Sequence, residues 1–96
     1  MSNTTAFSFE QILALDKPQH LTESLFASKD GIAEKAFISV EGEWRVMFHG
    51  VDPSLTEGHL LRDGASLTLL GELQIRNFRA LSLEPHCVLA ASYERK

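Results

Sequence analysis

The chain lacks most of the features on which common protein chemistry depends. It has one cysteine, Cys87, so it cannot form an internal disulfide, and its four histidines do not have the spacing of a zinc site. It has no serine nucleophile elbow, no phosphate-binding glycine loop and no zinc-protease helix motif. No apolar run approaches the roughly 20 residues of a membrane span. We therefore expect no enzymatic activity, no cofactor or metal, and no membrane contact.

The composition predicts one small soluble domain located in the cytoplasm. The 96 residues are 44% hydrophobic and 23% charged, which is ordinary for a globular protein and enough for one modest core. The first residues lack the basic stretch and the apolar run of a secretory signal. We expect residues 1–96 to form a single domain, with residues 1–6 as a disordered or frayed tail.

The net charge of −4 is unevenly distributed. Residues 1–61 have nine acidic against four basic side chains, whereas residues 62–96 have a net charge of +1. Strong non-specific binding to nucleic acid needs a basic surface that displaces counterions, so the balance disfavours it. An acidic body favours basic protein partners by electrostatic steering.

The N-terminal segment has the signals of a helix start. Residues 8–11 (Ser-Phe-Glu-Gln) match a capping box, in which Ser8 and Gln11 satisfy backbone N–H groups at the start of a helix. Phe9, Ile12 and Leu13 would share one helical face. Pro18 would end this helix, because the residue before a proline is disfavoured in helical geometry.

Residues 18–31 allow two interpretations. Pro18 at the start and Gly31 just past the end suit a second helix. The apolar residues of this segment also alternate, and residues 29–31 (Lys-Asp-Gly) would then form a hairpin loop. Both alternatives stay open at this point.

From residue 35 the hydrophobic period changes to two, which predicts a hairpin. The two strands would cover residues 36–40 and 44–48, on either side of a turn at Glu41 and Gly42. One face of this hairpin would collect the core side chains Ala36, Ile38, Val40, Trp44, Val46 and Phe48. Trp44 is therefore expected in the core.

The C-terminal third predicts an antiparallel meander. Residues 66–76 alternate around Gly71, which indicates a long half-buried strand with a bend. Two more strand-like runs follow, over residues 78–84 and 87–93. The single cysteine, Cys87, is expected as a small core residue.

These elements predict an α+β fold that is mainly antiparallel β. One or two N-terminal helices would pack on a strongly bent sheet of about five strands, which is either open or closed into a small, partly open barrel. Residues 63–73 (Asp-Gly-Ala-Ser-Leu-Thr-Leu-Leu-Gly-Glu-Leu) resemble a turn and strand of small oligonucleotide-binding (OB) barrels. The resemblance covers this segment alone and concerns the fold, not membership of a family.

The best candidates for binding residues are arginines. Arg76 and Arg79 flank Asn77 and Phe78 at an expected strand turn, and such a tip is suited to stacking a base or binding an anion. Arg45 is the remaining candidate, on the strand of Trp44. The alternative for the tip is a hairpin end in which Phe78 caps the core and the arginines pair with acidic residues.

We expect a non-enzymatic binding protein that acts through protein–protein interaction, as an adaptor, an inhibitor or a self-associating module. Its partner would be another protein or a second copy in a homodimer. The alternative is an OB-like barrel that binds single-stranded nucleic acid or a small anion through Arg45, Arg76, Phe78 and Arg79. A third interpretation is a small-molecule pocket lined by Phe9, Leu13, Phe37 and Trp44.

Overall fold

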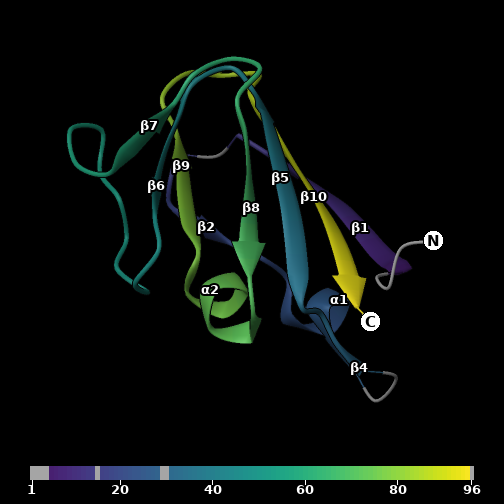
Figure 1. The fold of residues 1–96 in the computed structure, drawn as a ribbon. Coiled ribbons are helices and arrows are strands. Elements are labelled where there is room, and N and C mark those ends of the chain that lie inside the picture. Colours follow the sequence, from purple (N-terminus) through teal and green to yellow (C-terminus); the bar gives the residue numbers. More distant parts are fainter. Residues whose placement is uncertain (1–4, 15, 29–30, 96) are drawn as a thin grey trace.

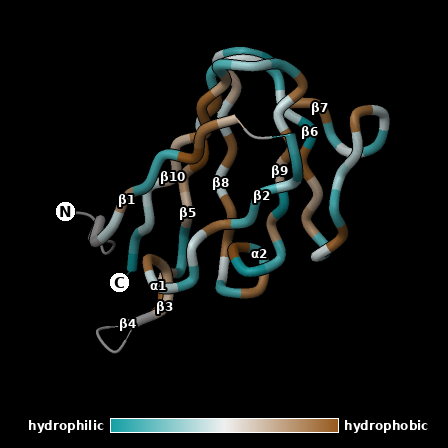
Figure 2. The backbone as a smooth tube through the Cα atoms, turned by 180° about the vertical axis from the view of Figure 1, so that it is seen from behind, coloured by the Kyte–Doolittle hydropathy of each residue, from teal (hydrophilic) through white to brown (hydrophobic). Residues whose placement is uncertain are grey.

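The chain folds into two four-stranded antiparallel sheets. The computed structural model describes residues 5–14, 16–28 and 31–95. Sheet A has the strand order β1 (Thr5–Leu13), β10 (Val88–Arg95), β5 (Lys35–Glu41) and β8 (Ser66–Leu70). Sheet B has the order β2 (Gln19–His20), β9 (Arg79–Ser82), β6 (Trp44–Met47) and β7 (His59–Leu61). Figures 1 and 2 show β1 at one edge of sheet A, beside β10.

The smaller elements gather at one end of the two sheets (Figure 1). They are the helices α1 (Glu23–Phe26) and α2 (Glu72–Asn77) and the two-stranded ribbon of β3 (Ala27–Ser28) and β4 (Gly31–Ile32). Neither described helix has the length and the apolar character that a membrane crossing requires.

One hydrophobic core joins the two sheets and both helices. Its largest fully buried side chains are Trp44, Tyr93, Phe26, Phe78, Ile38, Leu69, Ile75, Leu89, Val46 and Cys87. The predicted core positions of Trp44 and Cys87 are therefore confirmed. Because strands of both sheets and residues of both helices contribute to this cluster, each element depends on the others for the burial of its apolar face.

The predicted strands around residues 41 and 42 exist, but they do not form a hairpin. β5 belongs to sheet A and β6 to sheet B, so the chain turns a corner from one sheet to the other. Gly42 makes this corner with a φ of 82°, and the Gly42 N–H donates a hydrogen bond to an Asp63 carboxylate oxygen at 2.8 Å. A Cβ atom on Gly42 would overlap the Cys87 Sγ atom. The close packing of Cys87 thus requires glycine at the corner.

The predicted N-terminal helix is wrong, because residues 5–13 form strand β1. Antiparallel pairing with β10 places Phe9 opposite Ser92 and Leu13 opposite Val88. The expected capping residue, Ser8, instead donates its hydroxyl hydrogen to the carbonyl oxygen of Leu25. The apolar positions of this segment favour a helical period, and pairing with a strand far along the chain overrides it.

Residues 18–31 contain part of each interpretation. The helical part is the short α1, in which Phe26 is buried. The hairpin part is the pairing of Ala27 with Ile32 in β3 and β4, whose connecting residues 29–30 lie outside the described residues.

The long bent strand predicted over residues 66–76 is also wrong. β8 ends at Leu70, and Gly71, with φ 86° and ψ 159°, precedes helix α2. This helix buries Ile75 and leaves Leu73 exposed. Gly71 was correctly identified as a break in the chain direction, but the break starts a helix and does not bend a strand.

The class of the fold is confirmed as mainly antiparallel β with small helices, whereas the single bent sheet and the barrel are wrong. Each described sheet has two edge strands, so neither is closed. The predicted meander is wrong too, since β9 and β10 lie in different sheets. Of the predicted tail, residues 1–4 lie outside the described residues, and Thr5 and Ala6 begin β1.

Candidate interaction surface

The outward side of sheet A exposes several large apolar side chains. In β5 the side chains of Ala36, Ile38 and Val40 point into the core, so the intervening residues point away from it. The strand registers extend this outward set over all four strands. We call this surface the open face; its members are Phe9, Gln11, Leu13, Lys35, Phe37, Ser39, Glu41, Ser66, Thr68, Leu70, Val88, Ala90, Ser92 and Glu94.

Four large apolar side chains on the open face are accessible to solvent. Phe9 is 56% exposed, Leu13 66%, Phe37 46% and Leu70 58%. These values show that no described segment of the chain covers this side of sheet A. Monomeric proteins expose single apolar residues routinely, but several on one flat sheet face indicate a contact surface.

The two phenylalanines of the open face flank a strip of small side chains. Phe9 lies opposite Ser92, and Ser92 lies opposite Phe37 on the other side. The two rings are therefore two strands apart, about 10 Å at the usual strand spacing. In the next row, Ala90 lies between Gln11 and Ser39.

Charge is confined to the two ends of the open face. Lys35 and Glu94 are directly opposite each other at one end, and Glu41 lies at the other. The rows between them contain only apolar and uncharged polar side chains. Depletion of charge from the centre of a surface patch is the compositional signature of protein interfaces.

Arg76, a predicted binding residue, forms ion pairs with acidic residues of both helices. Its guanidinium forms ion pairs with Glu23 of α1 and Glu72 of α2, and it donates to Glu72 Oε2 at 2.6 Å. It also lies over the ring of Phe26, 5.3 Å from the ring centroid. The hydrogen bonds to Glu72 and Glu23 raise the pKa of Arg76 above its ordinary value. Arg76 thus links the two helices.

Phe78 and Arg79 do not form the expected exposed tip. Phe78 is 1% exposed, so its ring cannot stack on a base in this conformation. Arg79 Nη1 donates to the carbonyl oxygens of Arg76 and Phe78, both at 2.9 Å, and Arg79 Nε lies 3.9 Å from a carboxylate oxygen of Asp52. Pairing with residues of the acidic N-terminal half is the arrangement expected of a structural role.

Arg45 lies on the outward side of sheet B, under the loop that follows β6. Its Nη1 donates to the carbonyl oxygen of Gly58 at 3.2 Å, and its Nε is buried without a hydrogen-bond partner among the described residues. Arg45 pairs with Leu81, and Met47 pairs with Arg79, so Arg45 and Arg79 share this side of the sheet. The four predicted binding residues therefore do not meet in one concave, aromatic site.

The third interpretation grouped Phe9, Leu13, Phe37 and Trp44 around a pocket. The structure places the first three together on the open face, whereas Trp44 is fully buried between the sheets. The outward position of Phe37 was readable from the sequence, since it alternates with Ala36 and Ile38. The shared face of Phe9 and Leu13 was not, because it depends on β1 being a strand.

Neither a cluster of metal-ligating residues nor a similar known protein identifies a functional site in the described part of the chain. No three His, Cys, Asp or Glu residues lie close enough to hold a metal ion within residues 5–14, 16–28 and 31–95. The chain matches no protein-family model, no curated protein and no solved structure.

Proposed function

We propose that this protein is a non-enzymatic binding module that acts through protein–protein contact, and that its open face binds a second copy of the chain. The observation that supports the proposal is the group of four exposed large apolar side chains, Phe9, Leu13, Phe37 and Leu70, on one sheet face with an uncharged centre. Covering these side chains removes apolar surface from water, which is the main driving force of association.

A second copy of the chain is a suitable occupant of this face. Sheets stack face to face at about 10 Å with their strands roughly aligned, as in a β-sandwich. An uncharged centre lets two identical faces meet without burying unpaired charge, although each chain has a net charge of −4. A partner with a differently shaped or strongly charged surface would fit this face less well.

The end charges of the open face are also self-complementary. A two-fold axis between the stacked sheets runs either along the strands or across them. Along the strands, it brings Lys35 to Glu94 of the partner subunit, because β5 then lies over the partner's β10. Across the strands, it brings Lys35 to the partner subunit's Glu41, because residue 38 is the midpoint of β5. Opposite charges meet in both arrangements.

The size of the open face predicts a weak dimer. Four strands at ~4.8 Å spacing and about seven residues at ~3.3 Å give a flat footprint of roughly 400 Å² per copy. Protruding side chains make the accessible surface of this face larger than its flat footprint. It is still below the roughly 800 Å² that each partner buries in a stable complex of standard size. We expect micromolar or weaker dissociation, so the dimer forms reversibly with concentration.

Sedimentation equilibrium across a roughly hundred-fold range of protein concentration tests the proposal by mass action. The apparent mass of the wild type should rise toward that of a dimer. Phe37→Asp, which puts a charge at the centre of the open face, should stay monomeric. Leu73→Asp is the matched control, because Leu73 is 74% exposed on α2 and lies outside the open face; it should associate like the wild type.

Two outcomes contradict the proposal. A wild type that stays monomeric at every concentration would exclude self-association, and equal association of Phe37→Asp and wild type would exclude the open face as its surface. Thermal melting of both variants checks that they are folded. The cytoplasmic location stays a prediction from the sequence.

A further inference from the structure

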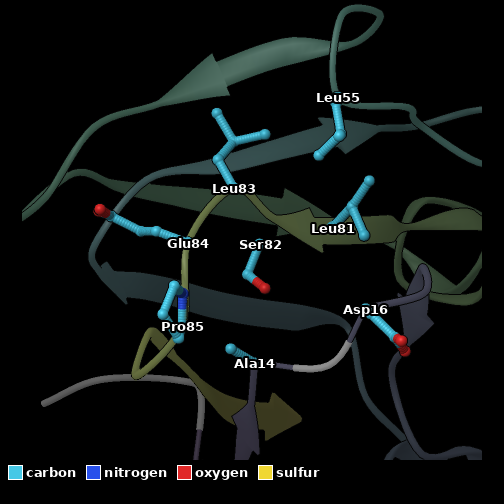
Figure 3. Close-up of a pocket in the computed structure, with 8 residues that line it drawn as sticks. All are labelled: Ala14, Asp16, Leu55, Leu81, Ser82, Leu83, Glu84 and Pro85. Carbon is cyan, nitrogen blue, oxygen red and sulfur yellow. The ribbon is translucent and has the colours of Figure 1, made fainter.

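A concave surface separate from the open face lies at the end of β9, beside the loop between β6 and β7. We call it the side groove; it has a volume of about 420 Å³. The described residues that line it are Ala14, Asp16, Leu55, Leu81, Ser82, Leu83, Glu84 and Pro85 (Figure 3). Its size falls in the lower part of the roughly 300–1,000 Å³ range of small-molecule sites.

The apolar wall of the side groove consists of three leucines. Leu81 and Leu83 point from the end of β9 toward Leu55, which reaches down from the loop between β6 and β7 (Figure 3). Leu81 is almost fully buried, whereas Leu55 is 64% exposed. An exposed leucine that faces two others across a groove is available to contact the apolar part of a ligand.

The loop that carries Leu55 is held in shape without a ligand. The Ser54 hydroxyl oxygen accepts hydrogen bonds from the N–H groups of Thr56 at 3.3 Å and Glu57 at 3.0 Å, and Ser54 N–H donates to the carbonyl oxygen of Glu57 at 3.0 Å. Pro53 is buried beside this turn. The side of the groove that carries Leu55 is therefore preformed, which lowers the entropic cost of binding there.

The charged residues of the side groove are both acidic. Asp16 and Glu84 lie at opposite ends of the lining, with Ser82 between them (Figure 3). Neither carboxylate forms an ion pair with a cation of the described chain. An apolar wall next to two carboxylates complements a ligand with an apolar body and a positive charge, and it repels an anion.

We propose that the side groove binds a small organic cation, with its ammonium group beside Asp16 or Glu84 and its aliphatic or aromatic body against Leu55, Leu81 and Leu83. This site is separate from the open face and does not depend on self-association. Because the groove is open to solvent and its carboxylates are exposed, the affinity for a small probe is expected in the millimolar range and decreases with salt.

Titration of the ¹⁵N-labelled protein with three probes of the same chain length tests the proposal. Hexylammonium should produce saturable amide shifts in residues 54–57 and 81–84. Hexanol should bind more weakly because it lacks the charge, and hexanoate should bind most weakly because its charge is negative. Saturation by hexanoate as strong as that by hexylammonium, or no saturation by hexylammonium, would overturn the proposal.

Variants separate the two contributions to binding. Asp16→Asn with Glu84→Gln should lower the affinity for hexylammonium about 2- to 5-fold per ion pair lost, the range measured for exposed pairs. The affinity for hexanol should not change. Leu55→Ser should lower the affinity for both probes. Glu34→Gln, which removes an exposed acidic side chain outside both the groove and the open face, is the control and should bind like the wild type. Equal affinity of the wild type and the Asp16 and Glu84 variant would exclude the carboxylates.

Phe37→Asp, the variant of the open face, should bind hexylammonium with unchanged affinity. This arm distinguishes failure of the side groove from failure of self-association, because each property has its own variant and its own measurement.

Discussion

The corner at Gly42 offers a quantitative test of the way the two sheets are joined. Replacing Gly42 with alanine has two costs. A φ of 82° costs a non-glycine residue roughly 1–2 kcal/mol. The new Cβ would also overlap Cys87 Sγ and lie 3.1 Å from Cys87 Cβ, and overpacking of this kind adds about 1–3 kcal/mol. The expected loss of unfolding free energy is therefore about 2–5 kcal/mol.

Gly64→Ala is a matched control for this experiment. Gly64 has a φ of 85°, and a Cβ at this position would meet no atom within 4 Å, so the variant has the backbone cost alone. Urea unfolding followed by the fluorescence of Trp44, the single tryptophan, measures both variants. Gly42→Ala should be less stable than Gly64→Ala by about 1–3 kcal/mol.

A second background identifies the source of the difference. In Cys87→Ala protein the sulfur is absent, so the cost of Gly42→Ala should decrease toward that of Gly64→Ala. Equal losses for the two glycine variants in the wild-type background, or an unchanged cost of Gly42→Ala without the sulfur, would refute the packing of Cys87 against the corner.

Three further predictions concern the remaining interactions. Tyr93 donates to Glu10 Oε2 at 2.5 Å, and burial, together with this hydrogen bond, raises the pKa of Tyr93, so the folded state retains the phenol proton to higher pH than the unfolded state. The contribution of Tyr93 to stability should therefore be constant below about pH 10 and decrease above it, and Tyr93→Phe should remove this decrease in pH-dependent urea unfolding. Arg76→Ala should lower the melting temperature because it unlinks α1 from α2, and a melting curve identical to that of the wild type would contradict this role. Arg76→Ala with Arg79→Ala should not change the affinity for a single-stranded oligonucleotide at low salt, whereas a clear loss measured by fluorescence anisotropy would restore the nucleic-acid alternative.

Local sequence patterns predicted the strands of the central region. The alternation over residues 36–40 and 44–48 located β5 and β6 and the core position of Trp44. It did not reveal that the strands belong to different sheets. A turn at Glu41 and Gly42 has the same local sequence in a hairpin and in a corner between sheets, and the strands far along the chain with which β5 and β6 pair distinguish the two.

The N-terminal strand shows the same limit more strongly. Phe9, Ile12 and Leu13 satisfy a helical period, whereas in a strand Phe9 and Leu13 lie on one face and Ile12 on the other. The pairing of β1 with β10 joins residues about 80 positions apart, so no local window contains the interaction that selects the strand. The open face was hidden for this reason, because half of its exposed apolar side chains come from β1.

The arginines show where charge patterns were informative. The alternative of paired arginines and a buried Phe78 describes the structure, in which Arg76 contacts Glu23 and Glu72 and Arg79 approaches Asp52. An acidic N-terminal half and a slightly basic C-terminal part made such pairs favourable. The individual partners depend on the tertiary fold and were not predictable from residue spacing.

The measurement that tests the central claim most directly is an isotope-filtered NOE experiment on a concentrated mixture of ¹³C-labelled and unlabelled protein. It detects only contacts between copies of the chain. The account predicts such NOEs at Phe9, Leu13, Phe37 and Leu70, and none at Leu55 or Leu73. Intermolecular NOEs confined to residues outside the open face, or none at a concentration where the wild type should associate, would contradict it.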